Sequence, residues 1–132
     1  MSGFRPASVI DRVEHDWGVF AQVSGPRDGL RGIVAIEATF LAGKAHAFHY
    51  HPGQEEVIYV LDGVVEQWVG AERSILAPGD AVVIGADVVH ATYNDGVDPA
   101  RILAVLSPAV DGDGYAAVDV SDEEPWATLR GA

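Results

Sequence analysis

The chain contains no cysteine, so disulfide bonds, thiolate nucleophiles and cysteine-ligated metal sites are excluded. Basic residues are also scarce: 8 Lys and Arg stand against 20 Asp and Glu, for a formal net charge of −12. Affinity for nucleic acids and for anionic membrane surfaces depends mainly on clustered Lys and Arg. We therefore expect neither nucleic acid nor a membrane as a partner.

Long apolar runs are missing as well. No stretch reaches the roughly 20 apolar residues that cross a bilayer, and the start, "MSGFRPASVIDRVEHD", shows no apolar signal region. We expect a cytoplasmic protein. The 132 residues are 48% hydrophobic, which is enough for one domain with its own core.

What the chain does have is short runs rich in Val, Ile, Ala, Phe and Tyr, broken by Gly, Pro and Asp. The turn residues recur at short, fairly even intervals, which is typical of β-sandwiches and barrels. Helical periodicity is weak, and the Ser121–Glu124 spacing before Pro125 predicts at most a turn. The predicted strands are residues 19–25, 32–40, 44–51, 55–61, 64–69, 81–85, 88–94 and 101–107.

The turns support an all-β fold. Asp62-Gly63 suits a tight hairpin, and Pro52-Gly53 and Pro78-Gly79 suit type II turns. A barrel or double-sheet jelly roll would protect the strand edges. We predict a single domain with an N-terminal arm or first strand at 1–17, a β-barrel at 18–110, and a C-terminal extension at 111–132 that packs on the barrel or on a partner subunit.

Histidines cluster in the stretch "KAHAFHYH". Side chains on a strand alternate between its faces, so His49 and His51 are predicted to share one face. His46 has the opposite parity and is predicted to point away from them. His46 and His15 are interpreted as packed or exposed residues, because a lone histidine in a strand is usually one or the other.

Two glutamates follow the Pro-Gly turn, and parity places Glu55 and Glu56 on opposite faces without choosing which joins the histidines. A further histidine, His90, lies in "VVHATYN". Three imidazoles and one carboxylate would leave one or two positions open on a first-row divalent metal, which is typical of a site that binds substrate, water or dioxygen.

These residues resemble the first motif of the cupin superfamily, G(X)5HXH(X)3,4E(X)6G. Gly43, "KAHAF" and the pair His49 and His51 fit its first half. The spacer "PGQE" then leads to Glu56, and "VIYVLD" leads to Gly63. The motif count selects Glu56 over Glu55.

The second cupin motif, G(X)5PXG(X)2H(X)3N, is matched with two departures. Gly79 and "DAVVI" lead to Gly85 in place of the proline and to Asp87 in place of the glycine. His90 and Asn94 then follow at the expected spacings. Asp87 is among the non-glycine residues that best tolerate a positive φ, so the turn is predicted to persist with an altered local shape.

The resemblance implies a jelly-roll β-barrel in which His49, His51, Glu56 and His90 bind one divalent metal. We rank Fe(II) first, then Mn(II), Ni(II) or Zn(II), and Asn94 is predicted to be structural. Cupins of this size include dioxygenases of the quercetinase and diketone-cleaving types, and also isomerases and decarboxylases. Many form homodimers, and we expect one here.

A metal-dependent dioxygenase acting on a small organic substrate that chelates the metal is thus the leading functional hypothesis. Glu56 would be a ligand and also a candidate general base. Because cations are few, a neutral or weakly acidic, partly apolar substrate is favoured. The rival is a non-catalytic module that binds or senses a metal or a small ligand. The candidate pocket residues are Phe40, Tyr59, Gln67, Trp68 and Tyr93.

Overall fold

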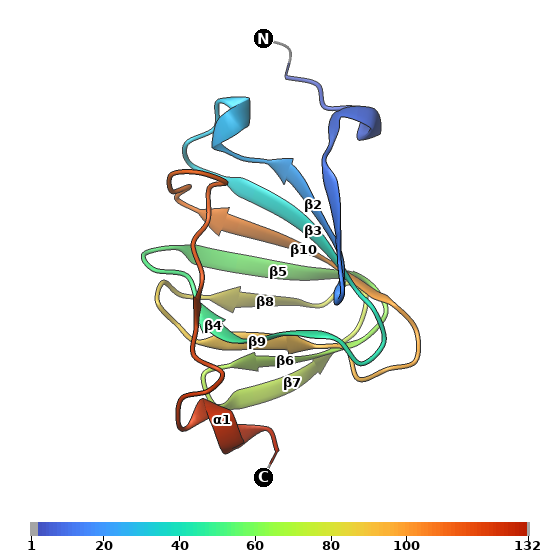
Figure 1. The fold of residues 1–132 in the computed structure, drawn as a ribbon, viewed down its shortest axis with the longest axis vertical. Helices are drawn as coiled ribbons and strands as arrows, with labels where there is room; N and C mark the ends of the chain where they lie inside the picture. The colour runs from blue at the N-terminus through green and yellow to red at the C-terminus, as the bar shows by residue number, and fades with distance from the viewer. Residues whose placement is uncertain (1–2, 132) are drawn as a thin grey trace.

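The computed structural model describes residues 3–131, which form two antiparallel β-sheets facing one another (Figure 1). One sheet has the strand order β1-β2-β3-β10-β5-β8, and the other has the order β11-β4-β9-β6-β7. This is the predicted jelly-roll class. The strands are β1 (Arg12–His15), β2 (Gly18–Ser24), β3 (Val34–Phe40), β4 (Ala45–Tyr50), β5 (Glu55–Asp62), β6 (Val65–Val69), β7 (Glu72–Leu76), β8 (Ala81–Ile84), β9 (His90–Tyr93), β10 (Ala100–Ser107) and β11 (Val118–Asp119).

Strands occupy all eight ranges predicted from the sequence. Strand β7 was not predicted, because "ERSIL" is mostly polar and exposed at the edge of its sheet. Within residues 3–131, helical structure is confined to the 3-10 turns η1 (Ala7–Val9) and η2 (Pro26–Asp28) and to α1 (Trp126–Leu129), a single turn. No helix among residues 3–131 is both long enough and apolar enough to cross a membrane.

The main core lies between the two sheets. Burial alternates along β3 and β10 and over residues 55–60 of β5, as expected where one face of a strand meets the core and the other meets solvent. Strands β6 and β7 of the second sheet contribute Val65 and Leu76 to the same cluster. The apolar side chains of both sheets therefore join in one interior, which surrounds the site described below.

The C-terminal extension packs on the body of the domain. After β10 the chain crosses from one sheet to the other, where β11 pairs with the end of β4, and it ends at α1 (Figure 1). Trp126 of α1 packs on Phe48, with ring centroids 5.4 Å apart. Arg130 lies 3.8 Å above the ring of Tyr93 and forms a 3.0 Å ion pair with Glu66. These contacts hold the extension against the outer face of the second sheet.

The outer face of the first sheet carries exposed apolar side chains. Val57, Tyr59 and Val83 are all exposed there, and β5 pairs with β8 so that Val57 lies opposite Val83. Such a row is compatible with subunit contact, and the expected homodimer stays a prediction.

The turns contain the positive φ angles that the sequence predicted. Gly53, Gly63 and Gly79 all have positive φ, and so does Asp87, at 64°. The carboxylate of Asp87 accepts a 3.0 Å hydrogen bond from the backbone N–H of Gly53. The turn before His90 thus keeps a left-handed residue where the cupin motif has glycine, and ties it to the turn that precedes β5.

Replacing Gly63 by alanine should destabilise the fold more than replacing Gly43. Both residues have positive φ, 74° and 77°, but a Cβ on Gly63 would lie 2.7 Å from Ala100 Cα, whereas one on Gly43 meets nothing within 4 Å. Left-handed backbone alone costs about 1–2 kcal/mol. We expect a loss of unfolding free energy near this value for Gly43→Ala and about 1–3 kcal/mol more for Gly63→Ala, because overpacking adds to the strain. Urea denaturation measures both, and equal losses would contradict the crowding at Gly63.

Candidate metal centre

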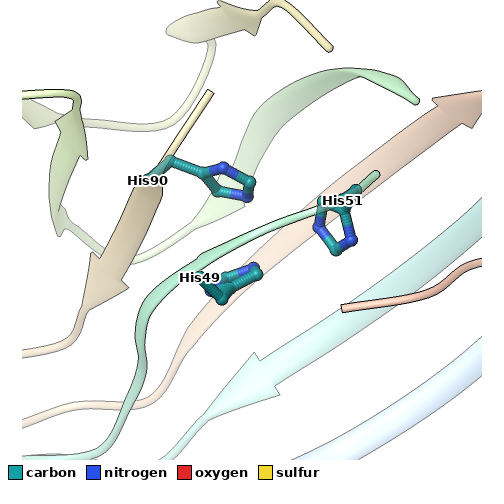
Figure 2. Close-up of side chains that lie close together, drawn as sticks. All are labelled: His49, His51 and His90. Atoms are coloured by element: carbon teal, nitrogen blue, oxygen red, sulfur yellow. The ribbon is translucent and has the colours of Figure 1, made fainter. Parts of the chain in front are cut away.

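Three histidines converge between the two sheets (Figure 2). His49 lies on β4, His51 directly follows β4, and His90 begins β9, opposite His49 in the strand register. One ring nitrogen from each can be chosen so that all three lie within 4.8 Å of one another. The predicted common direction of His49 and His51 is confirmed, and cross-strand pairing adds His90.

The backbone determines which nitrogen of each ring faces the centre. In all three histidines Nδ1 lies against a backbone carbonyl, which can only accept a hydrogen bond, so Nδ1 carries the proton and Nε2 keeps its lone pair. Orienting contacts of this kind are typical of metal-binding histidines. For His49, His51 and His90 the acceptors are Ala47 O at 2.6 Å, Ala116 O at 2.8 Å and Val88 O at 2.9 Å.

Glu56 is the carboxylate that faces this cluster, as the motif count predicted. Its side chain is 7% exposed, whereas Glu55 points to solvent. Its Oε1 atom lies 2.8 Å from Nε2 of His90 and 3.4 Å from Nε2 of His51. Across residues 3–131, neither Glu56 Oε1 nor His90 Nε2 has a hydrogen-bond partner of acceptable geometry.

This close contact shows that the site suits a cation. His90 Nε2 and Glu56 Oε1 both present lone pairs, both are buried, and they lie 2.8 Å apart. Two such acceptors repel unless a proton or a metal ion lies between them. Neighbouring ligands of one ion, with bonds of about 2.1 Å at right angles, are about 3 Å apart. Three imidazoles and a carboxylate, without thiolate, suit a divalent first-row metal.

The protonation states agree with this interpretation. Burial lowers the pKa of His49 to about 4, so its ring is neutral near pH 7. For Glu56, burial acts to raise the pKa, but the rings of His51 and His90 would donate to its carboxylate whenever Nε2 is protonated; this effect outweighs burial and lowers the pKa to about 2. Burial also acts to lower the pKa of His51, yet Glu56 raises it above 6.5 on balance. The cluster therefore holds a carboxylate that attracts a proton or a metal ion.

A cavity of about 850 Å³ opens beside the centre, between the two sheets. Its lining combines aliphatic side chains with histidines and with the carboxylates of Asp11, Glu56, Asp113 and Asp119, and Arg27 is the only Lys or Arg among the described residues that line it. Arg27 is already paired with Asp113 at 3.0 Å. The aliphatic part of the lining includes Ile36, Ala38, Ile58, Ile102, Ala104 and Leu106.

The five residues predicted to form the substrate pocket do not line this cavity. Two of them, Phe40 and Gln67, contact residues that do line it, His46 and Thr92. Phe40 is fully buried in the main core. Gln67 accepts a 2.6 Å hydrogen bond from the hydroxyl of Thr92, which does line the cavity. Both residues therefore support the walls rather than form them.

Tyr59, Trp68 and Tyr93 lie on outward faces. Tyr59 is 42% exposed on the outer side of the first sheet. Trp68 and Tyr93 belong to the second apolar cluster, under the C-terminal extension. Strand parity divides aromatic residues between two faces, and on the second sheet both faces are covered by packed side chains, so the presence of an aromatic residue in a strand was no guide to the cavity.

His46 is the main correction to the sequence analysis, because it faces the cavity instead of pointing away from His49 and His51. The pairing of β4 with β9 shifts register between His46 and His49, and this irregularity resets the alternation of side chains. Burial lowers the pKa of His46 to about 4. His15 also lines the cavity, stacked on Trp17 with ring centroids 5.1 Å apart.

Gln54 is a residue that the sequence analysis missed, although it lies within the four-residue spacer of the first motif. Its side chain is 1% exposed. The amide donates to Pro108 O at 2.7 Å and to Gly114 O at 2.9 Å, and its oxygen accepts from the N–H of Ala116 at 3.2 Å. Ala116 is the residue whose carbonyl orients His51. Gln54 thus fixes the segment of the extension whose carbonyl, at Ala116, orients the ring of His51.

Asn94 is buried at the other end of β9, and its contacts support the predicted structural role. Its amide donates to Phe40 O at 3.0 Å and to Asp98 O at 2.9 Å, and its oxygen accepts from the N–H of Gly96 at 3.0 Å. It ties the loop after β9 to the end of β3.

Comparison with known proteins agrees with the fold and with the family that the sequence motifs resemble. Residues 36–106 match the cupin domain family. The chain belongs to the cupin family. This cupin is 30% identical over 95 residues to polyketide synthase CurC of Streptomyces cyaneus, a match covering 72% of the chain but only 59% of CurC. Protein SchB of Streptomyces halstedii is 28% identical over 104 residues, 79% of this chain and 72% of SchB.

Among solved structures, KdgF from a Halomonas species superposes on this cupin with a TM-score of 0.72. The match covers 84% of this chain and 97% of KdgF at 22% identity. At that identity the likeness establishes the shared fold alone.

Metal binding should release a proton and weaken as the pH falls. Because Glu56 raises the pKa of His51, the metal-free site keeps its proton to a higher pH than a free imidazole would, and a metal must displace that proton. We expect the apparent Zn(II) affinity to fall steadily from about pH 8 to about pH 6, with proton release near pH 7. Calorimetry in buffers of different ionisation enthalpy measures both. Glu56→Gln should reduce the proton release, and a pH-independent affinity would contradict this account.

Gln54→Ala should weaken metal binding although Gln54 is not a ligand. Loss of its amide frees the segment that presents the carbonyl of Ala116 to His51, and outer contacts of this kind are worth about 10–100-fold in metal affinity. Competition with a chromophoric chelator measures the change. Gln22→Ala is the control, because Gln22 also donates to the extension, at Asp113 O, but does not contact Ala116. Equal effects of the two variants would show that general loosening of the extension is responsible.

Proposed function

We propose that this cupin is a metal-dependent enzyme that acts on a small, mostly apolar 1,3-dicarbonyl compound, with dioxygen-dependent cleavage as the reaction. One observation carries the proposal: three Nε2 atoms and the carboxylate of Glu56 converge beside a mostly apolar cavity of about 850 Å³. Ligand pockets are typically of this size and polarity. A site closed on all sides would favour a structural metal, whereas this one adjoins space for a substrate.

His49, His51, His90 and Glu56 would hold the metal, and Fe(II) remains our first choice, followed by Mn(II), Ni(II) and Zn(II). Such an ion supplies Lewis acidity to chelating oxygens and, as iron, a redox centre for dioxygen. The pKa of about 2 makes Glu56 a weak base at neutral pH. Its role as a ligand is therefore better supported than its role as a general base. A 1,3-dicarbonyl compound enolises readily, so its reaction needs no strong base.

The cavity favours this substrate class in two ways. Part of its lining is aliphatic, and its only Lys or Arg among the described residues, Arg27, is neutralised by Asp113. A strongly anionic substrate would find no free cation there. The similarity to CurC, which is named a polyketide synthase, points in the same direction, because polyketide chains carry carbonyl groups on alternate carbons.

Oxygen consumption by iron-loaded protein, purified without a His tag, tests the proposal. We expect one dioxygen consumed per molecule of 1,3-diketone, with flavonols and enediols as comparison substrates. His90→Ala should lose both metal and oxygen uptake, by about 100-fold or more in rate, because it removes a ligand. Glu55→Ala is the matched control, since Glu55 neighbours Glu56 but points to solvent.

Two outcomes would overturn parts of this proposal. Metal content below about one-tenth equivalent after reconstitution would exclude the metal site, since structural fit should give near-stoichiometric binding. Full metal loading with no oxygen uptake and no change in any substrate, for iron, manganese, nickel and zinc alike, would favour the non-catalytic binding module.

A further inference from the structure

We propose that His46 is a second anchoring point for the substrate, hydrogen-bonding to an oxygen that lies beyond the oxygens at the metal centre. The substrate is then a 1,3-dicarbonyl compound with a third oxygen further along its chain. This inference rests on the proposed function, because it requires a substrate held beside His49, His51 and His90. In this proposal His46 determines which of several similar 1,3-dicarbonyl compounds binds most tightly.

The register shift in β4 places His46 in the right position. The shift between His46 and His49 brings both side chains into the cavity wall. Their ring centroids are 6.3 Å apart. His46 is not part of the converging cluster, whose three ligand atoms all lie within 4.8 Å of one another. A separation of 6.3 Å is short enough for one small molecule to reach both His46 and the metal centre.

Aromatic neighbours hold the His46 ring in one orientation. It meets Trp17 edge-on, at 4.4 Å between centroids and 77° between planes, and meets Phe40 in the same way at 4.7 Å and 76°. Trp17 is itself backed by the stacked ring of His15. Edge-to-face contacts of this kind are favourable and directional. A polar group held in place before binding loses little rotational freedom when a ligand arrives.

The hydrogen-bonding capacity of His46 is not used within the described part of the chain. An imidazole offers one donor and one acceptor. The three histidines of the metal centre each satisfy Nδ1 with a carbonyl, but no residue from 3 to 131 forms a hydrogen bond with the ring of His46. Partly buried polar groups normally find a partner. In this mostly apolar cavity, the partner available to His46 is water or a ligand.

Zn(II)-loaded protein, purified without a tag, allows binding to be measured without oxidation. The two probes are pentane-2,4-dione, which has only the chelating pair of oxygens, and heptane-2,4,6-trione, which has a third. We expect calorimetry to show the trione binding about 5–10-fold more tightly to the wild type, the amount one hydrogen bond typically contributes. His46→Phe should abolish this preference while the dione binds as before.

His46→Gln is the matched variant, because it retains a donor and an acceptor and should keep part of the preference. Metal content should stay at one ion per chain in both variants, and their thermal unfolding identifies any loss of folding. Wild-type protein that binds metal and both probes without preferring the trione would overturn this inference and leave the proposed function intact. Loss of metal from His46→Gln would overturn it too, since His46 would then be a ligand. Wild-type protein that binds no metal would overturn both.

Discussion

The metal centre is defined by one close contact: two buried acceptors, Nε2 of His90 and Oε1 of Glu56, lie 2.8 Å apart. That contact is unfavourable unless a cation is shared between them. It is maintained because the two residues come from different sheets, β9 in one and β5 in the other. Packing between the sheets, together with the hydrogen bond from His90 to Val88, prevents the side chains from moving apart. The packing of the two sheets thus keeps the ligand atoms close together before a metal ion binds.

The C-terminal extension is part of this arrangement. It crosses between the sheets, pairs β11 with β4, and supplies the carbonyl that orients His51. Gln54 fixes the crossing segment from within the first motif, so the residues between the histidines and Glu56 also matter. At the far end, Arg130 and Trp126 anchor the extension to the second sheet. The metal centre is thereby built from segments that are distant in sequence.

Sequence predictions were accurate for features that depend on residues close together in the chain, and they failed for features that depend on long-range contacts. Alternating burial and turn glycines depend on neighbouring residues, so the strands and the positive φ of Gly63 were predictable. Glu56 was chosen by motif spacing and lies at the histidines. The direction of His46 was wrong because one irregularity in β4 reverses the alternation that parity assumes. Tyr59 was misplaced as a candidate pocket residue, since the parity that turns Glu56 inward places Tyr59 on the opposite, exposed face of β5.

The sequence by itself determined the all-β class, the family, and the histidines and glutamate that converge, because these are written in local periodicity and spacing. The tertiary structure alone decided which ring nitrogen of His51 faces the centre, since that depends on the carbonyl of the distant Ala116. It also decided that His46 faces the cavity, which arises from the register between β4 and β9. Contacts of this kind are set by how the sheets pack, and no local pattern encodes them.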